Sequence, residues 1–192
     1  MSELHEPNMN LYFIAIIPPP GLSSEIRAIK ERMLSLYGSG HALKSPAHIT
    51  LQMPFRRSID DEEAISDALR DFALKEKPFT IDLDGFGAFA PRVIYVRIRD
   101  HKPFIQLHSR LKEMLLTSLK FLPGEVMKDA EPHITVATRD LTKKAFSEAW
   151  PEIKGERIIS SFRVNSITLL RHTGKLWEIL EDFNFRHIDE GE

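Results

Sequence analysis

The chain contains one short pattern of chemically active residues twice. His48-Ile49-Thr50-Leu51 and His133-Ile134-Thr135-Val136 each place a histidine two positions before a threonine, and each follows a proline closely. Imidazole can accept or donate a proton near neutral pH, because its unperturbed pKa is about 6.5. A threonine hydroxyl can donate a hydrogen bond to charge that develops on a reacting group. Repetition in both halves of the chain favours a shared chemical role over two unrelated structural histidines.

The spacing has a geometric consequence if both segments are strands. Side chains at positions i and i+2 of a strand share one face and lie about 6.5–7 Å apart. His48 and Thr50 would then point to one side, while the apolar residues between and after them pack into the core. His133 and Thr135 would do the same. An approximate twofold relation between the halves would place two imidazoles on opposite sides of one cleft, with two hydroxyls between them.

This arrangement suits in-line attack at phosphorus. A neutral imidazole takes the proton of an attacking water or ribose hydroxyl, and a protonated imidazole gives a proton to the departing oxygen. The threonine hydroxyls can hold the non-bridging phosphate oxygens. No cofactor or metal ion is required, and neither a histidine pair nor the acidic run 60–63 has the spacing of a zinc site. A single histidine on a strand is more often structural, so the functional interpretation depends on the repetition.

Two arginines are further candidates for substrate binding. Arg139 lies six residues after His133, and strand alternation places it on the same face. Arg97 lies on the polar side of a strand expected over residues 93–99, so it could line the cleft. A solvated strand face is an equally good interpretation of Arg97.

Other residues near the motifs carry weaker signals. Lys44 flanks the first motif and could attract a phosphate, although solvent-exposed charge is the more common role of such a residue. His172 lies in a predicted hairpin turn and could reach the mouth of the cleft. The remaining histidines, His41 among them, have no partner pattern and are expected at surface or helix positions. Four aromatic residues could stack a base, but core packing is their more common role: Tyr12, Phe55, Phe86 and Phe89.

The segments around the motifs alternate between strand and helix. In the first half, apolar runs and turn residues predict strands over residues 11–17, 48–55 and 79–86 and helices over 23–36 and 60–72. In the second half they predict strands over 93–99, 133–138, 158–171 and 176–185 and helices over 102–121 and 142–154.

This order describes two β-α-β-α-β units in tandem, the second with an extra hairpin strand. It predicts an α+β fold in which two pseudo-symmetric lobes, residues 10–90 and 91–185, carry antiparallel sheets on either side of a central cleft, with helices on the outside. A single domain over residues 1–192 is expected, with residues 186–192 as a polar tail.

Composition narrows the functional classes. The 192 residues include 26 basic and 28 acidic side chains, a net charge of −2 that argues against a long track along duplex DNA but leaves room for a small phosphate pocket. The absence of cysteine excludes disulfides, thiolate metal sites and a cysteine nucleophile. The longest apolar run is far shorter than a membrane helix, and the polar N-terminus is unlike a secretory signal. We expect a cytoplasmic monomer without membrane contact.

With both motifs identified, the chain resembles the two-histidine (2H) phosphoesterase superfamily, and within it the bacterial 2′-5′ RNA ligase / RNA 2′,3′-cyclic phosphodiesterase branch. The resemblance extends from the apolar strand after Leu11, through both His-x-Thr motifs, to the closing hairpin that ends near Leu180. It implies that His48 and His133 are the catalytic acid and base, and that the two threonines hold phosphate. The implied reaction opens an RNA 2′,3′-cyclic phosphate to a 2′-phosphate. The reverse joins such an end to a 5′-hydroxyl as a 2′-5′ linkage, without ATP.

Two alternatives stay open. The same chemistry could act on a small cyclic phosphate, such as a nucleotide or an ADP-ribose derivative. The protein could also be a nucleotide- or RNA-binding module without catalysis, although both histidines and both threonines are present. A product assay that compares an oligonucleotide cyclic phosphate with small cyclic nucleotides would separate these possibilities.

Overall fold

The computed structural model describes residues 8–186, so the predicted polar tail lies outside the described residues except for Arg186. The strands are β1 (Met9–Ile16), β2 (Ile49–Ser58), β3 (Phe79–Phe89), β4 (Val93–Ile98), β5 (His133–Ala137), β6 (Ile159–Val164), β7 (Ser166–His172) and β8 (Trp177–Asn184). The helices are α1 (Pro20–Tyr37), α2 (Glu62–Ala73), α3 (Lys102–Thr117) and α4 (Lys143–Ile153), with short 3-10 turns η1 (His41–Lys44) and η2 (Ile59–Asp61).

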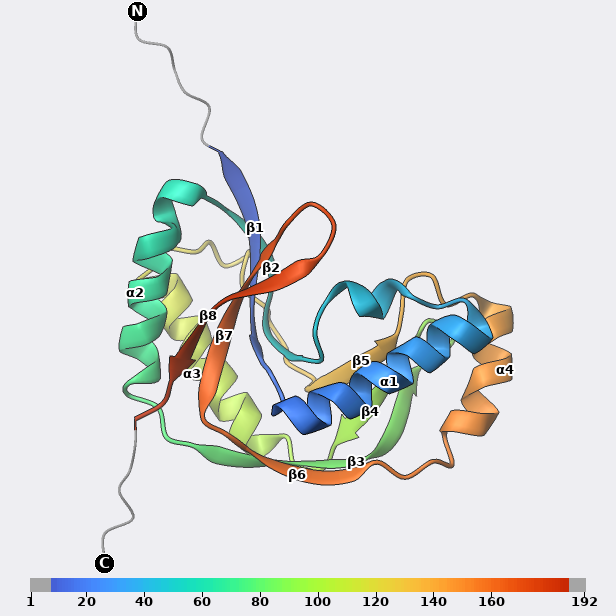
Figure 1. Ribbon diagram of the computed structural model, residues 1–192. Helices are drawn as coiled ribbons and strands as arrows, with labels where there is room; N and C mark the ends of the chain where they lie inside the picture. Colours follow the sequence, from blue (N-terminus) through green and yellow to red (C-terminus); the bar gives the residue numbers. More distant parts are fainter. Residues whose placement is uncertain (1–7, 187–192) are drawn as a thin grey trace, which may run out of the picture.

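The strands form two four-stranded sheets in which every pairing is antiparallel (Figure 1). The first sheet has the order β2-β1-β7-β8, and the second has the order β5-β4-β3-β6. The predicted α+β class with two antiparallel sheets is therefore confirmed.

The sheets do not coincide with the two expected lobes, residues 10–90 and 91–185. Strand β3, from the first half of the sequence, pairs with β4 and β6 of the second half. Strands β7 and β8, from the end of the sequence, complete the sheet of β1 and β2. The short connection between β3 and β4 makes these strands a hairpin, which keeps β3 with its successor rather than with β1. The two halves of the sequence thus exchange strands.

The prediction of a single strand over residues 158–171 is also wrong. The segment forms two strands, β6 in the second sheet and β7 in the first, with the break at Asn165. The Asn165 carbonyl accepts a hydrogen bond from the Phe185 backbone N–H at 2.7 Å instead of joining a sheet ladder. Both strands contain β-branched and apolar residues, so hydropathy alone does not reveal where the chain crosses between sheets.

The two motif strands occupy equivalent positions. Strand β2 ends one sheet and β5 ends the other, and these two edge strands contact each other. Each has a central strand as its neighbour, β1 for β2 and β4 for β5. The fold therefore brings the His-x-Thr segments together where the sheets meet.

The helices pack on the sheet faces that carry the buried apolar side chains, not on the faces that carry the motif histidines and threonines. Helices α2 and α3 lie beside the first sheet, with α2 against β7 and β8 and α3 against β2, while α1 contacts β5 and α4 (Figure 1). One continuous core of buried side chains runs through both sheets. The apolar residues of both motifs belong to it, with Ile49, Leu51, Ile134 and Val136 each at most 1% exposed. This alternation leaves the motif histidines and threonines on the other face. No helix within residues 8–186 is long and apolar enough to cross a membrane.

Candidate active site

Both motif histidines stand at the start of a strand and make the same hydrogen bond. His48 directly precedes β2, and its Nδ1 lies 2.9 Å from the carbonyl oxygen of Pro46. His133 opens β5, and its Nδ1 lies 2.7 Å from the carbonyl oxygen of Glu131. A carbonyl oxygen can only accept, so each Nδ1 carries the hydrogen and donates it. Each neutral imidazole therefore presents Nε2 as its free, basic nitrogen.

Aromatic rings from the neighbouring central strands pack against both imidazoles. The Phe13 ring of β1 lies 4.9 Å from the His48 ring, and the Tyr95 ring of β4 lies 4.9 Å from the His133 ring, measured between centroids. His133 has a second aromatic contact, Phe89 at 5.2 Å. These contacts and the Nδ1 hydrogen bonds fix how each imidazole is oriented, which a proton-transfer group requires.

Tyr95 depends on a glycine behind it. Gly87 of β3 is the cross-strand partner of Tyr95. A Cβ at Gly87 would come within 2.6 Å of Tyr95 ring carbons, closer than real contacts allow. The missing side chain therefore lets the tyrosine ring lie over the β3 backbone and support His133.

The two histidines differ in electrostatic environment. Burial lowers the pKa of His48 to about 4; the Pro46 hydrogen bond opposes this effect, and the positive charges of Lys30 and His133 add to it. Burial also lowers the pKa of His133, while the carbonyl and carboxylate of Glu131 oppose the shift. The two histidines belong to the start of edge strands that contact each other, and a positive charge on His133 lowers the pKa of His48.

A buried lysine lies behind His48. Lys30 of α1 is only 2% exposed, and its ammonium donates to the carbonyl oxygens of Ala42, Ser45 and Pro46 at 3.0, 3.1 and 3.2 Å. Pro46 therefore accepts from both Lys30 and His48 through one carbonyl. Burial lowers the pKa of Lys30 to about 8, so it stays charged at neutral pH. Helix α1 thus holds the segment that carries His48.

A cavity of about 770 Å³ opens over the motif strands, and four of the six predicted site residues line it: His48, Thr50, Thr135 and Arg139. His133 does not line it, but it lies on the same face of β5 as Thr135. Among the described residues that line the cavity are three basic side chains, Lys44, Arg139 and Lys175, and no aspartate or glutamate. The cavity is therefore suited to an anion.

Arg97 lies on the face of its strand that was predicted, but its guanidinium is directed to a neighbouring strand. It is the cross-strand partner of His133, but it does not line the cavity. Its Nε donates to the backbone carbonyl of Asp84 on β3 at 2.8 Å, and its side chain is exposed. A local acceptor on the adjacent strand thus holds the guanidinium away from the motif threonines.

Of the four aromatic residues considered from the sequence, none lines the cavity, and the core role favoured for them is confirmed for three. Tyr12, Phe55 and Phe86 are core residues, and Phe89 packs against His133. The wall is instead made by Phe13 and Trp177, whose rings are 4.6 Å apart, with His172 at 4.8 Å from Trp177. Phe13 could have been found from strand alternation, because its neighbours Tyr12 and Ile14 face the main core. Trp177 could not be found in this way, because it reaches the cavity only through the pairing of β8 with β7.

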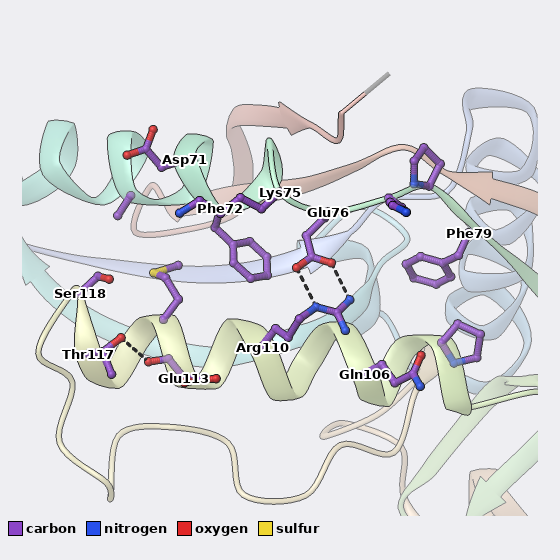
Figure 2. A pocket seen from close by; sticks show the side chains of 15 residues that line it. Asp71, Phe72, Lys75, Glu76, Phe79, Gln106, Arg110, Glu113, Thr117 and Ser118 are labelled. Atoms are coloured by element: carbon purple, nitrogen blue, oxygen red, sulfur yellow. Dashed lines mark hydrogen bonds and ion pairs between the residues drawn. The ribbon is translucent and has the colours of Figure 1, made fainter. Parts of the chain in front are cut away.

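A second cavity, of about 920 Å³, lies between α2 and α3 (Figure 2). Its central feature is the ion pair of Glu76 and Arg110, with N–O distances of 2.8 and 2.5 Å. Apolar side chains such as Phe72 and Phe79 make up much of the remaining wall. No motif residue lines it, and its most buried charged group, Glu76, is already paired with Arg110.

Within the described part of the chain, no group of three or more histidine, aspartate or glutamate side chains is placed to hold a metal ion. The groups available for chemistry in the motif cavity are thus imidazoles, hydroxyls and basic side chains.

Comparisons with known proteins agree with this architecture. The family model of the 2′-5′ RNA ligase superfamily matches residues 18–176. A Bacillus pumilus protein named as a phosphoesterase is 26% identical over 175 residues, covering 90% of this chain and 95% of its own length. A Bacillus licheniformis protein of the same description is 29% identical over 130 residues, covering 67% and 70% of the two chains.

Solved structures share the fold. Escherichia coli LigT in complex with 3′-AMP superposes with a TM-score of 0.64 at 20% identity, covering 95% of this chain and all of LigT. TT0787 of Thermus thermophilus superposes with a TM-score of 0.62 at 20% identity, covering 92% and 98%. The two-sheet arrangement is therefore common to these proteins despite low sequence identity.

Proposed function

The chain belongs to the 2′-5′ RNA ligase superfamily, and from this membership we propose that it hydrolyses RNA 2′,3′-cyclic phosphate ends to 2′-phosphates. One observation carries the proposal: His48 and His133 stand at equivalent places in two sheets, each with Nδ1 bonded to the carbonyl two residues earlier and Nε2 free. The reverse reaction joins a cyclic phosphate to a 5′-hydroxyl as a 2′-5′ linkage.

The proposed reaction needs one proton acceptor and one proton donor. A water oxygen attacks phosphorus, and Nε2 of one histidine takes the proton that the water loses. The bond between phosphorus and the 3′ oxygen breaks, and the imidazolium of the other histidine gives that oxygen a proton. The products are a 2′-phosphate and a 3′-hydroxyl. The two histidines exchange roles in the reverse direction, and the cyclic ester itself supplies the activation.

The proposed phosphate ligands are the side chains that share the cavity. The hydroxyls of Thr50 and Thr135 donate to the non-bridging oxygens, whose charge grows in the transition state. Arg139, which follows β5, adds a positive charge to the same cavity. Such donors stabilise the transition state more than the bound substrate when they are held in place beforehand.

A small cyclic phosphate is the second candidate substrate. The cavity volume of about 770 Å³ is in the range of small-molecule sites, and Phe13 and Trp177 provide apolar surface for a base. Escherichia coli LigT, which shares this fold, has been crystallised with 3′-AMP, with NADP+ and with ATP. A nucleotide or ADP-ribose cyclic phosphate is therefore the alternative substrate, and adenosine 2′,3′-cyclic phosphate represents it in the test, which also detects binding without turnover.

The test is a product assay in the presence of a chelator. The purified chain is incubated with an oligonucleotide that ends in a 2′,3′-cyclic phosphate and, separately, with adenosine 2′,3′-cyclic phosphate. We expect a 2′-phosphate product from the oligonucleotide, formed at the same rate with and without chelator. A product from the mononucleotide alone would favour the second candidate. Binding of the oligonucleotide without any product would indicate a binding module.

A further inference from the structure

One rim of the motif cavity carries a basic cluster, of which only Arg139 has been assigned above to the phosphate at the two histidines. The cluster consists of His41 and Lys44 of η1 together with Arg139, which follows β5. Turn η1 packs against β5, so the cluster joins two segments that are far apart in the sequence. Within residues 8–186, neither Lys44 nor Arg139 forms an ion pair, as the eight pairs there involve other residues.

A carboxylate behind the cluster holds its two parts together. Asp140 accepts hydrogen bonds from the Ser39 hydroxyl at 2.9 Å and from the backbone N–H groups of Gly40 and His41 at 3.0 and 2.8 Å. These three donors occupy the carboxylate oxygens. The loop before η1 and the loop after β5 are thus joined by three hydrogen bonds, and Arg139 keeps its charge available to the cavity.

The backbone at Arg139, whose side chain lines the cavity, has an uncommon conformation. Arg139 has φ = 55°, in the left-handed region that non-glycine residues rarely adopt. The Asp140 backbone N–H bonds to the Thr138 carbonyl at 2.7 Å and closes a tight turn around Arg139. Uncommon backbone conformations of this kind are retained where the surroundings enforce them, often at binding sites. The Asp140 contacts supply that enforcement.

We propose that Lys44 and His41 form a second phosphate-binding site, with Arg139 contributing positive charge to both sites, so that the substrate carries a further phosphate group beside the one at the two histidines. This inference rests on the proposed function, because it takes the motif residues as the site of the cleaved phosphate. Burial, and after it the positive charges of Arg139 and Lys44, lower the pKa of His41, while the carboxylate of Asp140 opposes them. A bound phosphate would neutralise the repulsion between the positive charges.

Two kinds of substrate contain the required group. An RNA end has a phosphodiester on the 5′ side of the nucleotide that carries the cyclic phosphate. A mononucleotide can carry a terminal phosphate at the same position. Both present phosphate oxygens to basic side chains, so the binding chemistry is shared, and the experiment must distinguish the two sources.

The experiment measures whether a second phosphate improves binding and turnover. Hydrolysis is compared for adenosine 2′,3′-cyclic phosphate, its 5′-phosphorylated form and a dinucleotide with the same cyclic end. We expect KM to be about ten-fold lower for both extended substrates, as one charge-assisted contact would give. A gain with the 5′-phosphorylated nucleotide alone would assign the site to a terminal phosphate, and a gain with the dinucleotide alone would assign it to an RNA end.

Binding measurements separate this inference from the proposed function. Calorimetry compares adenosine 2′-phosphate with adenosine 2′,5′-bisphosphate, which needs no turnover. Lys44→Gln should remove most of the ten-fold preference for the bisphosphate. The control is Lys144→Gln, which changes an exposed lysine of α4 outside the cavity and should retain the preference. Equal affinities for the two ligands in the unmodified protein, or an unchanged preference in Lys44→Gln, would overturn the second site. The proposed hydrolysis of the cyclic phosphate would still stand after such a result, because the product assay tests it separately.

Discussion

The two His-x-Thr strands share a pattern but not an environment. Both histidines bond a carbonyl two residues earlier through Nδ1, and both rest on an aromatic ring of the neighbouring central strand. His48 is backed by the buried ammonium of Lys30, whereas the backbone carbonyl that His133 uses belongs to the exposed residue Glu131. The repeated pattern fixes which nitrogen is free. The surroundings decide how readily each nitrogen takes a proton.

Removing either imidazole should have the largest effect. His48→Ala and His133→Ala should each lower kcat for a 2′,3′-cyclic phosphate by about 10³-fold or more, because one proton transfer loses its partner. Steady-state kinetics measure the loss, and thermal unfolding of both variants checks that the fold survives. The double variant should be little worse than either single variant, since the two groups act as a unit. Near-normal turnover in one single variant would show that the two histidines are not an acid–base pair.

The threonines provide a test of equivalence with a smaller effect. Thr50→Val and Thr135→Val should each lower kcat by about 10–10³-fold, the range for loss of one donor to developing charge. Because the two residues hold matching positions in their strands, the two losses should be of similar size. The measurement is kcat and KM for both variants on one substrate. A loss at one threonine only would show that the phosphate lies off the approximate twofold relation.

The difference between the pKa values of His48 and His133 can be changed by a substitution at Lys30. Lys30→Met removes a positive charge that lowers the pKa of His48, so the titration midpoint of His48 should move up from about 4 while that of His133 stays in place. Titration of the imidazole C–H signals by NMR measures both midpoints. In the rate profile, the limb that belongs to His48 should move to higher pH by the same amount. The carbonyls that lose their donor should also reduce the free energy of unfolding by about 1–3 kcal/mol.

The control for this variant is Lys30→Arg, which keeps a positive charge behind His48. Its histidine midpoints should lie closer to those of the unmodified protein than the midpoints of Lys30→Met do. An unchanged His48 midpoint in Lys30→Met would show that burial alone sets the pKa. The contrast between the two strands would then be one of burial and not of charge.

The sequence predicted what depends on local periodicity. Strand alternation placed the motif threonines and histidines on one face and the intervening apolar residues in the core, because side chains of a strand alternate whatever the strand pairs with. It did not predict which strands pair. The exchange of β3, β7 and β8 between the halves depends on hairpin connections and on the crossing at Asn165, which carry no hydropathy signal.

Residues that enter the site through tertiary contacts were also missed. On α1, apolar residues recur at helical spacing at Ile26, Ile29, Met33 and Leu36. The first three pack in or against the core, but Leu36 is 61% exposed and Lys30 is buried. Hydropathy assigns a lysine to the surface, and only the three carbonyls facing it make its burial favourable. His41 was missed for a related reason, since a four-residue turn has no period to recognise.

The smallest expected effect concerns the two arginines proposed from sequence. Arg139 lines the cavity, whereas the guanidinium of Arg97 is held by the Asp84 carbonyl on β3. Arg97→Gln should therefore change kcat/KM by less than about two-fold, and Arg139→Gln should lower it by about ten-fold or more, as loss of a charged phosphate contact would. Parallel kinetics on one cyclic phosphate substrate provide the measurement. A large loss in Arg97→Gln would mean that the guanidinium leaves Asp84 when substrate binds, so that the His133 side contributes a second cation and the two strands differ in charge as well as in pKa.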